Sequence, residues 1–170
     1  MPLYYALRQG HDAVALVLLE HFTDVKGVLS WTSSMSTALL LVSYLGLPEL
    51  VRVCLKRGAD VGTEDAEGMT ALHYALLGGG REVCRECAER AFFGMRKEIV
   101  FESKGEGWGA DVETVRLLLE AGADLDARRV IRGWRHRHTA RELARRHPDT
   151  EMRRECGIEG GWLGGFVRRR

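Results

Sequence analysis

An internal period of 33 residues constrains the fold of this chain more than any other feature of its sequence. The tripeptide Thr37-Ala38-Leu39 returns as Thr70-Ala71-Leu72, and a glycine stands nine residues after each threonine, at Gly46 and Gly79. A repeat of this length indicates one small supersecondary unit per period. Such a unit cannot bury its apolar side alone, so neighbouring units must stack.

Short apolar segments follow the turn glycines. Leu16–Leu19 lie shortly after Gly10, and Leu50–Leu55 lie shortly after Gly46. These segments are too short to be stable as isolated helices and too apolar to lie alone on a water-exposed surface. Glycine tolerates the left-handed backbone conformation in which a helix ends and the chain turns back. We therefore predict an all-α fold of stacked helix-turn-helix units.

A second tripeptide, Gly58-Ala59-Asp60, returns as Gly122-Ala123-Asp124, and residues 68–75 read Gly-Met-Thr-Ala-Leu-His-Tyr-Ala. Together with the period, these residues resemble the ankyrin repeat. The resemblance covers roughly three quarters of the chain. It implies an α-solenoid of stacked helix-turn-helix units with short β-hairpin turns. It also implies a non-enzymatic module that binds other proteins.

The repeat template divides the chain into one domain and a tail. We expect the ankyrin-repeat domain to cover residues 1–156, and the Gly- and Arg-rich tail, residues 157–170, to be poorly ordered. The last unit carries Pro148 in place of the turn glycine and ends in a polar segment, which suits a C-terminal cap. The four units are expected at residues 2–24, 36–60, 69–124 and 138–156.

The third unit carries an insertion, expected at residues 80–109, and is 31 residues longer than the second unit. Apolar residues recur at helical spacing within Arg81–Phe93, so we predict an additional amphipathic helix there. Three glycines within Ser103–Gly109 predict a flexible return loop. Insertions of this kind usually lie on one face of a repeat array and often serve binding.

Composition favours an intracellular protein. No apolar run approaches the roughly 18 residues that a membrane-spanning helix needs. The four cysteines, Cys54, Cys84, Cys87 and Cys156, are too few and too unevenly spaced for a disulfide framework. We expect the cytoplasm or the nucleus, and a protein that is a monomer or a part of a longer chain.

Three features that resemble catalytic or ligand motifs have simpler explanations. Cys84 and Cys87 have no second pair at ligand spacing, and a structural zinc takes four ligands. His73 has no nucleophile at a motif spacing, and we expect it to hydrogen-bond neighbouring backbone. Gly78–Gly80 lacks the lysine and the hydroxyl residue of a phosphate-binding loop. We expect no catalytic residue, no metal and no cofactor.

The formal net charge of +1 conceals two regions of opposite charge. Residues 1–126 hold 12 Lys/Arg and 19 Asp/Glu, whereas residues 127–170 hold 13 Arg and 5 Asp/Glu. Three interpretations of the basic region stay open. Residues 128–154 could bind nucleic acid or another anionic surface, they could bind an acidic protein surface, or the arginines could simply be solvated.

In ankyrin-repeat proteins the hairpin tips and the exposed side of each first helix line a concave groove for partners. The resemblance predicts that the partner is another protein, and the contact positions of the family are carried over to this chain by their place in the repeat. Tyr, Trp, Met and Arg are enriched in interface cores. The predicted partner-binding residues are Trp31, Met35, Tyr44, Leu45, Met69, Leu77, Arg129, Trp134, Arg135 and His138. The hairpin that joins two successive units is called a finger, and the second finger, between the second and third units, adds Glu64, Asp65 and Glu67. We expect Trp31, Tyr44, Leu45 and Met69 to form one exposed apolar strip.

Overall fold

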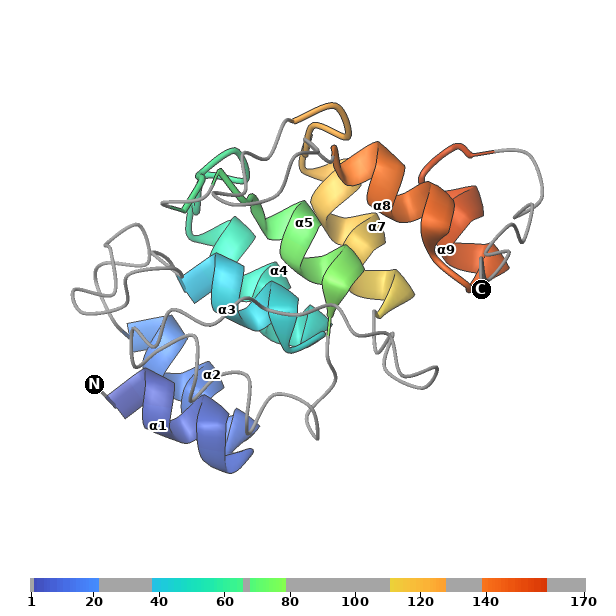
Figure 1. Cartoon of the computed structure of the whole chain (residues 1–170). Coiled ribbons are helices and arrows are strands. Elements are labelled where there is room, and N and C mark those ends of the chain that lie inside the picture. The colour runs from blue at the N-terminus through green and yellow to red at the C-terminus, as the bar shows by residue number, and fades with distance from the viewer. Residues whose placement is uncertain (1, 22–37, 66–67, 79–110, 128–138, 159–170) are drawn as a thin grey trace.

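The computed structural model describes residues 2–21, 38–65, 68–78, 111–127 and 139–158. Within these residues the regular elements are α-helices, as Figure 1 shows. They are α1 (Pro2–Gln9), α2 (Asp12–His21), α3 (Ala38–Tyr44), α4 (Pro48–Lys56), α5 (Ala71–Leu77), α7 (Val112–Glu120), α8 (Ala140–Arg146) and α9 (Thr150–Glu155). The predicted all-α fold is confirmed.

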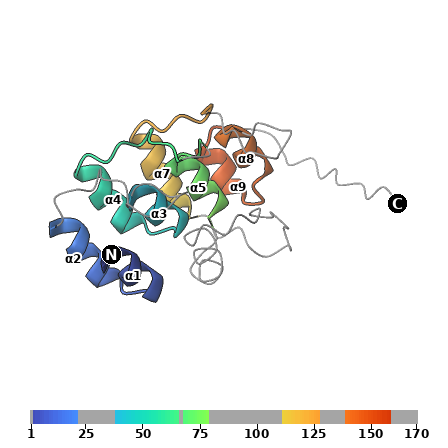
Figure 2. The ribbon, with the colours of Figure 1, turned by 60° about the vertical axis from the view of Figure 1, so that its left-hand side comes forward.

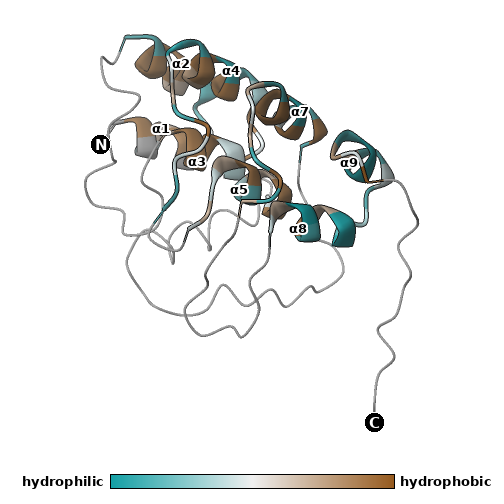
Figure 3. Cartoon of the chain, turned by 90° about the horizontal axis from the view of Figure 1, so that it is seen from above, coloured by the Kyte–Doolittle hydropathy of each residue, from teal (hydrophilic) through white to brown (hydrophobic). Residues whose placement is uncertain are grey.

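The helices form pairs that stack in two rows (Figure 3). The pairs are α1/α2, α3/α4, α5/α7 and α8/α9, and the members of each pair pack against each other. The inner row consists of α1, α3, α5 and α8, and the outer row consists of α2, α4, α7 and α9. Figure 2 shows the same stack with α1/α2 at one end and α8/α9 at the other. The predicted stacking of helix-turn-helix units is therefore confirmed.

Side chains at helix starts and a glycine at a helix end fix the local structure. The Asp111 carboxylate accepts a hydrogen bond from the Thr114 amide at 2.7 Å, and Asp149 accepts one from the Glu151 amide at 2.8 Å. Each such cap stabilises its helix by about 1 kcal/mol. Gly46 follows α3 with a φ of 62°, a conformation that would strain a residue with a Cβ atom. The glycine therefore lets the chain turn directly from α3 into α4.

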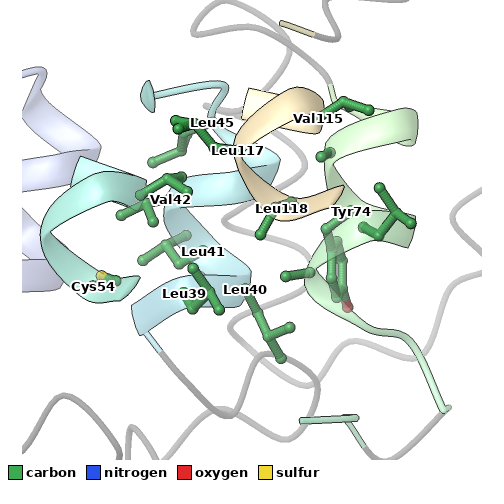
Figure 4. Close-up of a cluster of buried hydrophobic side chains, with 14 of the residues drawn as sticks. Leu39, Leu40, Leu41, Val42, Leu45, Cys54, Tyr74, Val115, Leu117 and Leu118 are labelled. Carbon is green, nitrogen blue, oxygen red and sulfur yellow. The ribbon is translucent and has the colours of Figure 1, made fainter. Parts of the chain in front are cut away.

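The apolar core is densest in the middle of the stack. Residues Ala38–Ser43 of α3 and Ala71–Leu76 of α5 are all buried. Figure 4 shows leucines of α3 close to Leu118 of α7. A helix that is buried on all sides needs neighbours on all sides, which the adjacent pairs and the outer row supply. Replacing one such leucine by alanine costs about 2–5 kcal/mol of stability.

Some sequence predictions concern residues outside the described ranges. These include the helix predicted at Arg81–Phe93, the return loop at Ser103–Gly109 and the tail beyond Ile158. The boundaries of the repeat units stay predictions as well. Within the described residues no β-strand occurs, and the described parts of the finger between α4 and α5, residues 57–65 and 68–70, consist of turns and irregular chain.

Candidate functional site

The inner row carries a partly exposed aromatic side chain at the end of α3. Tyr44 is half-buried and packs edge-to-face against Tyr74 of α5, with ring centroids 6.0 Å apart and an interplanar angle of 85°. Such aromatic pairs contribute roughly 0.5–1.5 kcal/mol beyond the area that they bury. This contact fixes the orientation of the Tyr44 ring where two repeat units meet.

Asp65, in the finger between α4 and α5, holds Tyr74 in place. Its Oδ2 accepts a hydrogen bond from the Tyr74 hydroxyl at 2.6 Å, and its Oδ1 accepts one from the Met69 amide at 2.8 Å. The backbone closes the same turn, because the Asp65 amide donates to the Met69 carbonyl at 3.0 Å. This network was not predicted from the sequence. The spacing between Asp65 and Tyr74 is not typical of any motif, so it does not indicate that the two side chains form a hydrogen bond.

Two residues of the predicted strip, Leu45 and Met69, are buried, which corrects that prediction. Met69 is 1% exposed and Leu45 is 6% exposed, so both are core residues. Leu45 is buried because the helical hydrogen bonding of α3 continues one residue further, its amide donating to the Leu41 carbonyl at 3.1 Å. Met69 is buried because the turn closed by Asp65 folds it inward, and the Asp65 carboxylate is itself buried. The prediction that these side chains lie exposed is wrong.

Tyr44, Leu77 and Arg146 occupy equivalent positions in three successive units, each seven residues after the threonine that precedes its inner-row helix. Tyr44 and Leu77 are half-buried, and Arg146 is exposed. We call these three residues the inner strip. Along the inner row, this strip changes from aromatic to aliphatic to basic.

Two arginines of the outer row, Arg52 and Arg116, are paired within the molecule. Arg116 of α7 bonds Glu155 of α9 at 2.8 Å and Glu113 of its own helix at 3.1 Å. Arg52 of α4 forms an ion pair with the same Glu113. Arg52, Glu113, Arg116 and Glu155 therefore form an ion-pair ladder across three successive units. The sequence shows only the pair within α7, at a helical spacing of three residues, so the rest of the ladder was not predicted.

The basic residues of α8 divide into paired and unpaired side chains. Arg141 binds the Asp126 carboxylate with two hydrogen bonds, of 2.8 and 2.9 Å, which lower the pKa of Asp126. Arg145 and Arg146 are exposed and make no hydrogen bond or ion pair with the described part of the chain, although the charge of Arg145 also lowers the pKa of Asp126. Two guanidinium groups near the C-terminal end of the inner row are thus available to an anionic partner.

The remaining predicted partner-binding residues lie outside the described residues. They are Trp31, Met35, Arg129, Trp134, Arg135 and His138. Of the ten predicted positions, the structure therefore places Tyr44 and Leu77 on the surface of the inner row, and it places Leu45 and Met69 in the core.

Comparisons with known proteins agree with the repeat architecture. Residues 44–85 match the family described as ankyrin repeats in many copies. Notch-regulated ankyrin repeat-containing protein B of Danio rerio is 33% identical over 87 residues, which cover 51% of this chain and 78% of that protein. The human Notch-regulated ankyrin repeat-containing protein is 33% identical over 79 residues, covering 46% of this chain and 69% of that protein. The chain belongs to the ankyrin-repeat family.

Ankyrin repeats are generally protein-interaction modules, and two side chains among the described residues of this ankyrin-repeat chain that could be reactive, Cys54 and His73, are buried. Burial raises the pKa of the Cys54 thiol to about 12, so this cysteine stays protonated and is a poor nucleophile. His73 is fully buried, and its Nδ1 accepts a hydrogen bond from the Thr70 amide at 3.2 Å. The expected backbone bond of His73 is therefore confirmed, and it caps the start of α5.

The described residues of this ankyrin-repeat chain hold neither a cluster of metal-ligating side chains nor a membrane-spanning helix. In those ranges, no group of three or more His, Cys, Asp or Glu side chains is arranged to hold a metal ion. None of the helices described there has the length and the apolar character needed to cross a membrane.

Proposed function

We propose that this ankyrin-repeat chain binds a partner protein along the inner strip and the adjoining finger tips. The observation that carries the proposal is that Tyr44 and Leu77 lie half-buried at equivalent positions of neighbouring units, and that Arg146, at the same position of the next unit, is exposed and makes no ion pair with the described residues. The predicted finger residues Trp31, Met35, Arg129, Trp134, Arg135 and His138 would extend the same surface.

The two ends of the inner strip would contribute differently to binding. Tyr44 is pre-oriented by its contact with Tyr74, so little side-chain entropy is lost when a partner covers it. Aromatic and aliphatic side chains that become desolvated supply most of the affinity of an interface. Exposed arginines mainly steer association and set orientation, and their effect falls with salt. The partner would therefore present an apolar group flanked by acidic residues.

Affinity capture with the immobilised chain, followed by mass spectrometry, tests the proposal. Leu77→Glu combined with Arg146→Glu should lose the proteins that the native chain retains. Arg154→Glu is the matched control, because Arg154 is an exposed arginine of the outer row. Thermal unfolding must show that all variants remain folded. Equal capture by the native chain and the double variant would discard the inner strip.

A second candidate function is binding of nucleic acid or another anionic surface through residues 128–154. Arg145 and Arg146 favour it, because both are exposed and neither forms an ion pair within the part of the chain that the structure describes. Titration of the chain with duplex and single-stranded DNA and RNA at two salt concentrations distinguishes the two functions. Phosphate contacts give an affinity that falls steeply with salt, whereas an interface dominated by Tyr44 and Leu77 depends weakly on salt.

We propose an intracellular location, in the cytoplasm or the nucleus. Cys54 and Cys156 are both free and buried, which is compatible with a reducing compartment. Imaging of the tagged chain in cells, with protease added after selective permeabilisation of the plasma membrane, tests the location. Loss of the fluorescence is expected for the cytoplasm or the nucleus, whereas fluorescence protected inside an organelle would contradict the proposal.

A further inference from the structure

The inner strip is one side chain wide where it crosses α3 and α5. Tyr44 is half-buried, whereas its neighbours Ser43 and Leu45 are buried. Leu77 is likewise half-buried between two buried neighbours. Each of these helices therefore offers a partner a single apolar side chain at this position.

The residues of the inner strip recur at the spacing of the stacked helices. α3 packs on α5 and α5 packs on α8, so the three strip residues stand on helices that follow one another along the inner row (Figure 3). The axes of packed helices lie about 8–10 Å apart. Because Tyr44, Leu77 and Arg146 hold equivalent positions, they recur along the row at about the same interval of 8–10 Å.

An extended partner segment can bind all three residues only if its own side chains recur at this interval on one face. In a β-strand the side chains on one face recur every two residues, or about 6.6 Å, which is too short. In a polyproline II helix they recur every three residues at a rise of about 3.1 Å per residue, or about 9.3 Å. The interval of the inner strip therefore matches a polyproline II segment.

An α-helix matches the interval of the inner strip but not its width. Residues seven apart in an α-helix are separated by about 10.5 Å along the axis. A helix that binds a protein, however, lays side chains at i, i+3, i+4 and i+7 into a broad apolar groove. The neighbours of Tyr44 and Leu77 in the chain are buried, so the described part of α3 and α5 offers a narrow line instead.

The position of the inner strip in α8 is basic. Arg146 is exposed and forms no ion pair with the described residues, and Arg145 beside it is exposed as well. An aspartate or glutamate of a partner would form a charge-assisted hydrogen bond there. Tyr44 and Leu77 gain from losing contact with water instead, so they favour leucine, valine or proline opposite them.

We propose that the inner strip binds a polyproline II segment of a partner protein, with apolar residues at positions i and i+3 and an acidic residue at i+6. The proposal rests on the function proposed above, because it names the class of segment that the same surface takes. The apolar residues pack on Tyr44 and Leu77, and the acidic residue pairs with Arg146. Proline holds such a segment in its bound conformation before it binds, which lowers the entropy lost on binding.

Fluorescence anisotropy with two labelled peptides of equal composition tests the spacing. The first peptide carries two leucines and a glutamate three residues apart, the second carries them two residues apart, and prolines fill the other positions of both. Each peptide is also made in reversed order, because either chain direction brings the three side chains to the strip. We expect the first peptide, in its better direction, to bind at least about fivefold more tightly than the second, with a dissociation constant on the order of 10–100 μM. Equal or tighter binding of the second peptide would overturn the proposal.

A charge exchange tests the pairing with Arg146. Arg146→Glu should weaken binding of the first peptide about fivefold or more, because it replaces an attraction by a repulsion. The same peptide with lysine in place of its glutamate should bind the Arg146→Glu variant as tightly as the original peptide binds the native chain. Arg154→Glu, in the outer row, should leave binding of both peptides unchanged. A loss in Arg146→Glu that the lysine peptide does not restore would exclude the pairing and overturn the proposal.

Failure of the extended segment is distinguishable from failure of the proposed function. If neither peptide binds, yet Leu77→Glu with Arg146→Glu still loses proteins in affinity capture, the strip binds a partner of another shape. The polyproline II segment is then wrong and the function stands. If the double variant captures the same proteins as the native chain, the function fails and the segment fails with it.

Discussion

Asp65 lies in unusual surroundings for an acidic side chain, because it is only 7% exposed although it belongs to the finger between α4 and α5. An acid in a finger was expected to face solvent, yet both of its carboxylate oxygens accept hydrogen bonds from buried groups. A buried carboxylate is tolerated only when such bonds are made. Asp65 thereby connects the finger to Tyr74, and through Tyr74 to Tyr44 of the inner strip.

Replacing Asp65 by alanine should cost about 1–3 kcal/mol of stability, because the Met69 amide and the Tyr74 hydroxyl each lose a buried acceptor. Urea unfolding followed by circular dichroism measures the loss. Glu64→Ala is the control, since Glu64 is exposed and its removal should change stability by less than about 0.5 kcal/mol. Similar losses for the two variants would show that the Asp65 network is not a significant stabilising contact.

His147, directly after α8, should make stability depend on pH. Burial lowers its pKa, and its Nδ1 accepts a hydrogen bond from the Asp149 amide, which requires an unprotonated Nδ1. The unfolded chain then binds a proton more tightly than the folded chain, so stability falls as the pH drops through the unfolded-state pKa of about 6.5. Melting temperatures between about pH 7.5 and pH 5.5 should fall less in His147→Gln than in the native chain. His11→Gln, at an exposed histidine, should retain the native slope.

At the scale of the elements, the repeated residues predicted the helices well. Thr70, Thr139 and the turn glycines stand where helices begin and end, because caps and left-handed turns depend on residues close in sequence. The exposure of single side chains was predicted less well. Leu45 and Met69 are buried by the continuation of a helix and by the fold of a turn, and neither effect changes the residue pattern. Tertiary contacts such as the bond between Arg116 and Glu155 join residues 39 positions apart, for which the sequence offers no periodic signal.

The ion-pair ladder should couple α7 to α9 in a salt-dependent manner. The hydrogen bond from Arg116 lowers the pKa of Glu155, so this stabilisation is present above the unfolded-state pKa of about 4.3 and is lost as the pH falls through the lower folded-state pKa. Glu155→Gln should lower the melting temperature slightly at pH 7 in low salt, and the difference from the native chain should shrink in high salt. Glu120→Gln removes an exposed carboxylate of α7 outside the ladder and should have no such effect. A salt-independent difference would show that the loss comes from packing rather than charge.

For the whole molecule, stacked units imply that stability is distributed unevenly along the chain. Six residues of α5 and six of α3 are buried, whereas α2 buries only Ala15 and Leu19. In a repeat array each unit is stabilised by its neighbours, so the pair with the fewest buried contacts opens first. Amide hydrogen exchange should therefore be slowest in α3, α5 and α7 and faster in α1 and α2.

Two alanine substitutions at equally buried leucines would test this gradient. Leu118 in the middle of the stack and Leu19 in the first pair are both almost completely buried, so each replacement should cost about 2–5 kcal/mol locally. Leu19→Ala should accelerate exchange in α1 and α2 alone, because those helices open without the rest. Leu118→Ala should accelerate exchange in α3, α5 and α7 as well, because the central units unfold together. Equal acceleration across all helices in both variants would mean that the chain opens as a single cooperative unit, and the neighbour-by-neighbour account of its stability would then be wrong.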